Sequence, residues 1–232
     1  MRVETITSAQ NPKIKNLLLL QEKSKARREQ GLFVVEGRRE LEHCIEAGFR
    51  VRTVFVCPEV AGADISTSLE TTVSCHSEEA EGRRENLHIV EIPEALYRKV
   101  AYREGTEGVL AEVEVRERRL EDLALSEHPL VMVLESVEKP GNLGAVLRSA
   151  DAARADAVVV CDPLTDLWNP NLIRASIGAV FTVPTVCASS AETIDWLKSR
   201  GIRIPMLGRL DSLNVSVSAA ILLFEAVRQR NV

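Results

Sequence analysis

The stretch LVMVLESVEKPGNLGAVLRSADAARADAVVVC, residues 130–161, contains two apolar runs on either side of an Ala-rich amphipathic segment. The runs at 130–134 and 157–161 consist of apolar residues without interruption, which is typical of strands that a parallel sheet buries on both faces. Residues 144–154 carry apolar side chains at helical spacing and predict a helix. Strand, helix, strand in this order predicts an α/β domain with parallel strands.

The same alternation continues toward the C-terminus. FTVPTVC at 181–187 predicts a third strand, and residues 191–200 and 215–230 predict two further helices. Ligands of open parallel sheets bind at the carboxyl ends of the strands. The loops that follow these strands are therefore where we expect the functional residues.

The N-terminal half predicts a second α/β domain. We expect helices at 12–28, 38–48 and 93–101, and strands at 32–37, 51–57, 88–92 and 108–115. The charged residues 116–128 separate the halves and predict a linker. The predicted organisation is therefore a domain at 1–115, a linker at 116–128 and a domain at 129–232.

Composition excludes several classes of protein. The chain of 232 residues has 45% hydrophobic and 27% charged residues, which is typical of a globular protein. Its five cysteines form no CxxC pair and its four histidines have no ligand spacing, so neither a disulfide framework nor a metal site is expected. No apolar run is long enough to cross a bilayer, and we expect a cytoplasmic protein.

The charge distribution leaves two interpretations open. The net charge of −5 does not indicate a nucleic-acid binder, but the region from Lys13 to Arg52 is locally basic. This region could follow a phosphate backbone, or it could be a solvated helix face.

The loop after the first strand of the C-terminal half carries candidate functional groups. Pro140 and Gly141 predict a turn, Asn142 stands near the expected helix cap, Gly144 begins the helix, and Arg148 lies one turn in. An arginine there could bind a phosphate or stabilise negative charge on a ribose oxygen. It could also be an ordinary surface residue. The loop lacks the G-x-G-x-x-G pattern, which argues against a nicotinamide-binding domain.

Two segments, NLGAVLR at 142–148 and IPMLGRLDSLNVSVSAAILLFEAVRQR at 204–230, resemble the first and third motifs of the SpoU/TrmH family, the third almost residue for residue. NPNLIRASIGAVFTVPT at 169–185 is similar to the stretch that connects these motifs in the family. Residues 11–37 and 106–115 resemble the ribosomal-protein-L30e-like RNA-binding domain that many members carry. Nearly the whole chain is covered.

This resemblance implies an α/β fold with a C-terminal parallel-sheet SPOUT domain, tied in a deep trefoil knot, and an N-terminal α/β L30e-like domain. It implies S-adenosyl-L-methionine (AdoMet) as cofactor, structured RNA as partner and a homodimer through the methyltransferase domain. By motif position, the cofactor pocket would be lined by Ile204, Met206, Gly208, Ser212 and Leu213. The ribose would face Asn142, Arg148, Ser212 and Asn214.

The implied reaction is methylation of a ribose 2′-hydroxyl in RNA. We expect ribosomal RNA as the substrate, with transfer RNA as the alternative. A guanidinium has a pKa above about 12 and keeps its proton. We therefore expect Arg148 to orient and electrostatically activate the 2′-hydroxyl, and we assign no proton acceptor. A binding module that holds structured RNA without methylating it is the competing class of function.

The chain departs from the family pattern at one place. A second motif, a strand followed by a G-x-E-x-x-G turn, is expected between the other two, yet Arg203 is followed directly by Ile204. Either the segment is deleted and the chain is a non-catalytic relative, or the sequence omits residues that the protein contains. We favour the omission, because loss of a central strand would leave backbone groups unpaired in the core.

Overall fold

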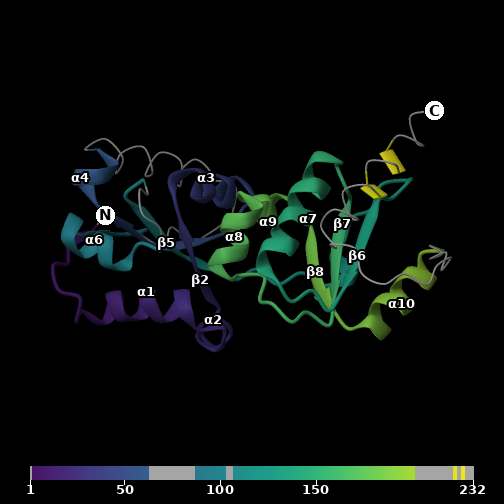
Figure 1. Ribbon diagram of the computed structural model, residues 1–232, viewed down its shortest axis with the longest axis horizontal. Helices are drawn as coiled ribbons and strands as arrows, with labels where there is room; N and C mark the ends of the chain where they lie inside the picture. The colour runs from purple at the N-terminus through teal and green to yellow at the C-terminus, as the bar shows by residue number, and fades with distance from the viewer. Residues whose placement is uncertain (1, 63–86, 103–106, 202–221, 224–225, 228–232) are drawn as a thin grey trace. The chain divides into compact units, whose positions relative to one another are not determined.

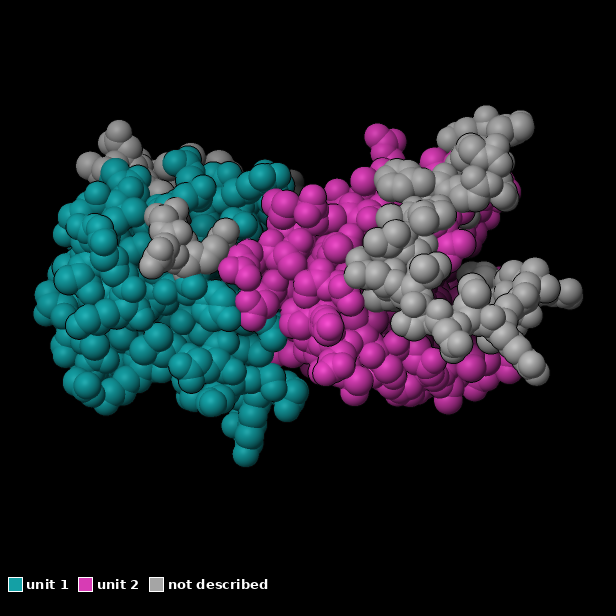
Figure 2. Space-filling model, viewed as in Figure 1, with its two compact units in different colours: residues 1–116, 168–170 teal, residues 117–167, 171–232 magenta. Residues whose placement is uncertain are grey.

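The computed structural model describes residues 2–62, 87–102, 107–201, 222–223 and 226–227. The chain forms two compact units (Figure 2). Unit 1 comprises residues 1–116 and 168–170, and unit 2 comprises residues 117–167 and 171–232.

Unit 1 is built on a five-stranded mixed sheet with strand order β1-β4-β3-β5-β2. The strands are β1 (Arg2–Thr5), β2 (Leu32–Glu36), β3 (Val51–Val56), β4 (His88–Glu91) and β5 (Val109–Glu114). β4 pairs in parallel with β1 and β3, whereas β5 pairs antiparallel with β2 and β3. The four strands predicted in this half are present, and β1 is an additional strand that the sequence reading missed.

The helices of unit 1 are α1 (Pro12–Glu22), α2 (Ser24–Gln30), α3 (Arg38–Glu46), α4 (Pro58–Ala61) and α6 (Glu94–Val100). The single helix predicted at 12–28 is wrong, because the backbone is extended at Lys23 and separates α1 from α2. The buried Arg27 side chain folds back and donates hydrogen bonds to the carbonyl oxygens of Leu20 (2.6 Å) and Gln21 (3.1 Å). A side chain of α2 thus satisfies carbonyl groups that the end of α1 leaves open.

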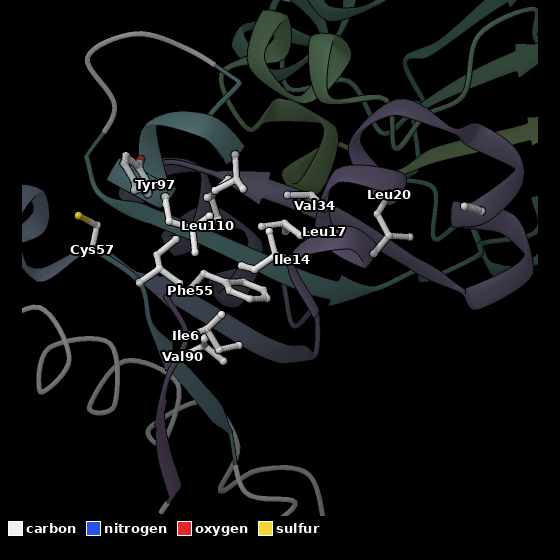
Figure 3. Close-up of a cluster of buried hydrophobic side chains, with 14 residues drawn as sticks. Ile6, Ile14, Leu17, Leu20, Val34, Phe55, Cys57, Val90, Tyr97 and Leu110 are labelled. Atoms are coloured by element: carbon white, nitrogen blue, oxygen red, sulfur yellow. The ribbon is translucent and has the colours of Figure 1, made fainter. Parts of the chain in front are cut away.

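One face of α1 forms the core of unit 1. Ile14, Leu17 and Leu20 are fully buried and pack with Phe55 and Leu110 from the sheet (Figure 3). The apolar face of α1 therefore packs on the sheet, and the basic residues of the helix lie outside this core.

Unit 2 contains a three-stranded parallel sheet in which β7 lies between β6 and β8 (Figure 1). Its elements are η1 (Leu120–Asp122), β6 (Val131–Glu135), α7 (Pro140–Ala152), β7 (Ala157–Cys161), α8 (Pro170–Ser176), α9 (Ala179–Thr182), β8 (Thr185–Ala188) and α10 (Ser190–Ser199). Every residue of β7 is buried. The parallel α/β arrangement predicted for this half is confirmed.

The third predicted strand, 181–187, is only partly right. Phe181 and Thr182 belong to the short helix α9, and the strand begins at Thr185. Pro184 has no N–H to give to a sheet, and its carbonyl oxygen instead accepts a hydrogen bond from the N–H of Val158 (2.9 Å). The ladder therefore starts after the proline.

Most of the predicted linker 116–128 belongs to unit 2, which begins at Glu117. Leu120 and Leu123 are buried in a cluster with Ala157, Trp196 and Leu197. The Asp156 carboxylate accepts hydrogen bonds from the backbone N–H groups of Ser126 (2.8 Å) and Leu130 (2.6 Å). This segment is thereby fixed along the start of β6.

Helices α7 and α8 touch where α7 has no side chain. A Cβ added at Gly144 would lie 2.6 Å from Ala175 Cβ and 2.8 Å from the Ser176 backbone nitrogen. Real Cβ atoms do not approach backbone this closely, so the packing of the two helices requires glycine at this position.

We predict that Gly144→Ala destabilises the protein by about 1–3 kcal/mol through overpacking, despite a gain of up to about 1 kcal/mol in helix propensity. Gly141→Ala in the same helix is the matched control, since a Cβ there meets nothing within 4 Å. Urea denaturation of both variants measures the difference. A Gly144→Ala protein as stable as the wild type would contradict the close approach.

Candidate functional site

Helix α7 begins earlier than the sequence predicted. The expected start was Gly144 with Asn142 near the cap, but the helix starts at Pro140 and Lys139 is the N-cap residue. Proline suits the first helical position, because its ring fixes a helical φ and its missing N–H has no intrahelical partner there. Asn142 is therefore inside the first turn, and its N–H donates to the Lys139 carbonyl oxygen (3.0 Å).

One side of α7 is core and another is open. Leu143, Val146 and Leu147 are fully buried, whereas Arg148 is exposed and Asn142 is half-buried. Among the residues that the structure describes, none forms an ion pair or hydrogen bond with the Arg148 guanidinium. Within the described part of the chain, the guanidinium N–H groups of Arg148 are therefore available to bind a ligand.

The surface between Arg148 and the start of α7 carries little bulk. Gly141 precedes Arg148 by seven residues, which is about two helical turns or roughly 10 Å along the same face. The space around Gly141 is open. A ligand next to Arg148 can consequently approach the N-terminal turn, where the helix dipole favours negatively charged oxygens.

The helix that packs against Gly144 ends in a strained turn. Ile177 and Gly178 both have positive φ, 53° and 83°. A β-branched residue rarely adopts this conformation. The turn is held by the buried Ser176 hydroxyl, which donates to the Ile173 carbonyl oxygen (2.9 Å) and accepts from the Val180 N–H (3.4 Å). The end of α8 is thus fixed by its own hydrogen bonds.

Polar groups that the sequence reading missed gather at the carboxyl ends of β6 and β7. The Ser190 hydroxyl lies 2.6 Å from Asp162 Oδ2 and 3.0 Å from Glu135 Oε1. Hydrogen bonds from the Ser190 hydroxyl and N–H lower the pKa of Asp162. One hydroxyl proton serves only one of the two carboxylates, and the shorter contact assigns it to Asp162.

The backbone turns sharply at the same two strand ends. Ser136 and Asp162 directly follow β6 and β7, and both have left-handed φ values, 51° and 45°. The Ser136 N–H donates to the Cys161 carbonyl oxygen, and the Asp162 N–H donates to the Ala188 carbonyl oxygen (both 2.9 Å). The three strand ends are therefore tied together at the edge where ligands of parallel sheets bind.

The start of α10, close to these strand ends, could have been predicted from the sequence. Ser189 and Glu192 form a capping box at the start of α10, with the Glu192 carboxylate accepting from the Ser189 N–H (2.9 Å). The Ser189 hydroxyl, with the backbone N–H, lowers the pKa of Glu192. The S-x-x-E spacing would have placed the helix start at Ser190 instead of Ala191.

The structure brings together only some of the predicted site residues. Asn142 and Arg148 both lie on α7, Asn142 in its first turn and Arg148 more than two turns from its start. The others lie outside the described residues: Ile204, Met206, Gly208, Ser212, Leu213 and Asn214. Of the predicted last helix, only 222–223 and 226–227 are described, and they are helical.

None of the described helices is both long enough and apolar enough to cross a membrane.

Two family models match the chain. The MRM3-like substrate-binding domain matches residues 11–111, and the SpoU rRNA methylase family matches residues 129–203. The second match ends at Arg203, the point where the second motif is absent.

Relatives match along almost the whole chain. The chain is 26% identical to the 23S rRNA (guanosine(2553)-2′-O)-methyltransferase RlmP of Bacillus subtilis (strain 168). The alignment covers 96% of this chain and 98% of that protein. An AdoMet-bound rRNA methyltransferase structure from Sinorhizobium meliloti is 24% identical, with a TM-score of 0.78 and 98% of both chains covered. This structure has the same fold.

A solved RNA 2′-O ribose methyltransferase is 34% identical, with a TM-score of 0.73, covering 98% of this chain and 100% of that chain. The family resemblance predicted from the motifs is thereby confirmed. The chain belongs to the SpoU rRNA methylase family and carries an N-terminal substrate-binding domain of the MRM3-like type.

Proposed function

We propose that this protein uses AdoMet to methylate a ribose 2′-hydroxyl in 23S ribosomal RNA. The observation that carries the proposal is the exposed Arg148 on α7, the helix that follows the first strand of a parallel sheet, in a chain of the SpoU family. The B. subtilis relative is named for this reaction on 23S rRNA, and the S. meliloti structure is described as AdoMet-bound.

Arg148 orients the substrate and stabilises charge. AdoMet, when bound, supplies an activated methyl group, and the attacking 2′-oxygen has to lie in line with the bond that breaks. The Arg148 guanidinium remains charged, so it donates hydrogen bonds to the 2′-oxygen or a neighbouring phosphate and favours the developing negative charge. Asn142, six residues earlier in α7, contributes a second polar group toward the ribose.

We assign the cofactor pocket to the C-terminal segment. Ile204, Met206, Gly208, Ser212 and Leu213 line it, Ser212 and Asn214 face the ribose, and the segment forms a deep trefoil knot. The left-handed residues Ser136 and Asp162 follow β6 and β7 at the carboxyl ends of the strands, where parallel sheets bind their ligands, and this supports a pocket at that edge.

The remaining assignments extend the same proposal. Residues 1–115 bind structured RNA, 116–128 connect the domains, and 129–232 carry out methyl transfer. The protein forms a homodimer through its methyltransferase domain and works in the cytoplasm.

A non-catalytic RNA-binding relative is the second candidate. Two observations favour it: the SpoU match ends at residue 203, and the alignment with the B. subtilis relative extends over 267 positions, more than the 232 residues of this chain. A chain without the second motif would lack part of the family's cofactor site.

We predict that the full-length protein binds AdoMet saturably in a calorimetric titration. Leu213→Asp should abolish the heat of binding, since it puts a charge into the proposed pocket. Leu222→Asp is the control, because Leu222 is 64% exposed. A wild-type protein without saturable binding would reject the enzyme in favour of the non-catalytic candidate.

We predict that Arg148→Ala lowers the rate of methyl transfer by about 10²-fold or more while AdoMet affinity stays within about twofold. Arg148→Lys should restore little, because lysine keeps the charge but loses the planar fork of donors. Ser149→Ala is the matched control, since among the described residues its hydroxyl donates only to the Ala145 carbonyl oxygen of the same helix (3.1 Å). A fully active Arg148→Ala protein would show that the role is misassigned.

We predict that cells lacking this protein lose one 2′-O-methylated ribose in 23S rRNA. Sequencing that maps ribose methylation in the presence and absence of the gene measures this directly. Loss of a methyl group from transfer RNA, with 23S rRNA unchanged, would overturn the choice of substrate.

A further inference from the structure

The first two helices of unit 1 are bound to each other by side-chain hydrogen bonds. The Arg27 side chain, in the middle of α2, bonds the carbonyl oxygens of Leu20 and Gln21 in the last turn of α1. At the end of α2, Gln30 Nε2 donates to Asn16 Oδ1 (2.9 Å), one turn earlier in α1. Helix α2 therefore folds back against α1, and the two helices form a single structural element.

This pair of helices is also bound to the rest of unit 1. Asn16 Nδ2 donates to Glu112 Oε1 of β5 (3.1 Å), and Gln21 Nε2 donates to the carbonyl oxygen of Val100 at the end of α6 (2.9 Å). These bonds add to the burial of the apolar face of α1. The backbone under the outer surface of α1 and α2 is thus fixed before any ligand binds, which favours binding there.

The outer surface of the two helices is basic, although the chain as a whole has a net charge of −5. Two exposed acidic residues, Glu22 and Glu29, lie on it. The exposed basic residues are twice as many, and we name them the α1–α2 basic face: Lys15, Lys23, Lys25 and Arg28. A local surplus of positive charge on an acidic protein indicates a negatively charged partner.

The two acidic residues hold their lysines only weakly. Lys23 Nζ lies 4.0 Å from Glu22 Oε2, and Lys25 Nζ lies 3.7 Å from Glu29 Oε1. The lysine side chains are 64% and 80% exposed. Ion pairs this open to solvent are weak, so an anionic ligand can displace either carboxylate.

The other two cations of the face meet no carboxylate in the part of the chain that the structure describes. Arg28 Nη1 donates to the neutral Ser24 hydroxyl (3.4 Å), and Lys15 forms no ion pair there. All four cations of the α1–α2 basic face are therefore able to bind an anion.

The composition of the helices indicates which kind of anion. Residues 11–30 contain no aromatic side chain, whereas proteins that hold unpaired bases stack them on aromatic rings. A helix that binds a membrane surface turns an apolar face outward, but the apolar face of α1 is buried and Leu19, at 44%, is its only large apolar side chain that is exposed. The match to the substrate-binding family model begins at residue 11, so it includes both helices.

We propose that the α1–α2 basic face binds the phosphate backbone of the RNA substrate and does not read its sequence. The proposal rests on the function proposed above and adds where, and through which chemical groups, the N-terminal unit holds RNA. A cation that contacts a phosphate releases condensed counterions, so the logarithm of the binding constant falls by about 0.7–0.9 per contact for each tenfold rise in salt.

The first test measures binding of the full-length protein to a 23S rRNA transcript at several KCl concentrations, without AdoMet. The combined variant Lys23→Gln, Lys25→Gln, Arg28→Gln should bind at least tenfold more weakly at about 0.1 M KCl, with a salt slope lower by about 2–3. Glutamine keeps the helix propensity of these positions. Glu22→Gln with Glu29→Gln should bind at least twofold more tightly, because it removes the carboxylates that compete with phosphate.

A charge-matched control distinguishes the face from net charge. Lys99→Gln, Arg154→Gln and Lys198→Gln together remove three exposed cations elsewhere on the chain and should leave affinity within about threefold of wild type. Equal weakening by both triple variants, or none by the α1–α2 variant, would overturn the proposal. Unchanged RNA binding with lost binding to phosphatidylserine vesicles would assign the face to a membrane instead.

A second measurement tests whether the face ignores sequence. The ratio of affinities for the native transcript and for one with substituted loop bases should be the same, within about twofold, in the α1–α2 variant and in the wild type. A changed ratio would contradict a phosphate-only contact. If the variant binds weakly but the wild type transfers no methyl group, the face stands and the proposed function fails. If the wild type methylates 23S rRNA and the variant binds as tightly, the reverse holds.

Discussion

The bare backbone contact between α7 and α8 at Gly144 is the constraint on which unit 2 depends. Helix α7 buries Leu143, Val146 and Leu147 in the core and exposes Arg148 on its other side. Because the α8 backbone lies against Gly144, α7 has no freedom to rotate or slide without a clash. The same contact that packs the core therefore also fixes the direction of the one cation proposed to meet the ribose.

Local patterns predicted most of the fold, and the errors have particular physical causes. Continuous apolar runs identified β6 and β7, because a strand buried on both faces needs no polar residues. The helix break at Lys23 could not be predicted from the sequence. It occurs together with hydrogen bonds from the Arg27 side chain to the carbonyl oxygens of residues six and seven positions earlier. The place of Trp168 in unit 1 could not be read either, because it depends on rings more than a hundred residues away.

The candidate site was predicted unevenly for the same reason. Asn142 and Arg148 follow from a motif confined to one helix, so the sequence located them together. The group of Glu135, Asp162 and Ser190 comes from three separate strand ends, and only the parallel strand order brings it together. Within the described residues, β6 pairs only with β7, and its first three residues are half-buried while β7 is fully buried. The second motif of the family contains a strand, and a strand beside β6 would cover this edge. The uncovered edge at β6 and the absence of the second motif are therefore related.

An acidic protein that acts on RNA must supply positive charge locally, and the structure narrows where the basic N-terminal region can do so. Arg27 is 2% exposed and is used within the fold, so it cannot contact a phosphate. Lys13, Lys23 and Lys25 are exposed but paired with Glu4, Glu22 and Glu29. Exposed pairs of this kind contribute at most about 1 kcal/mol each, so a phosphate can replace the carboxylate at small cost. The surface ion pairs therefore leave these lysines able to bind RNA phosphates, whereas the buried Arg27 cannot reach them.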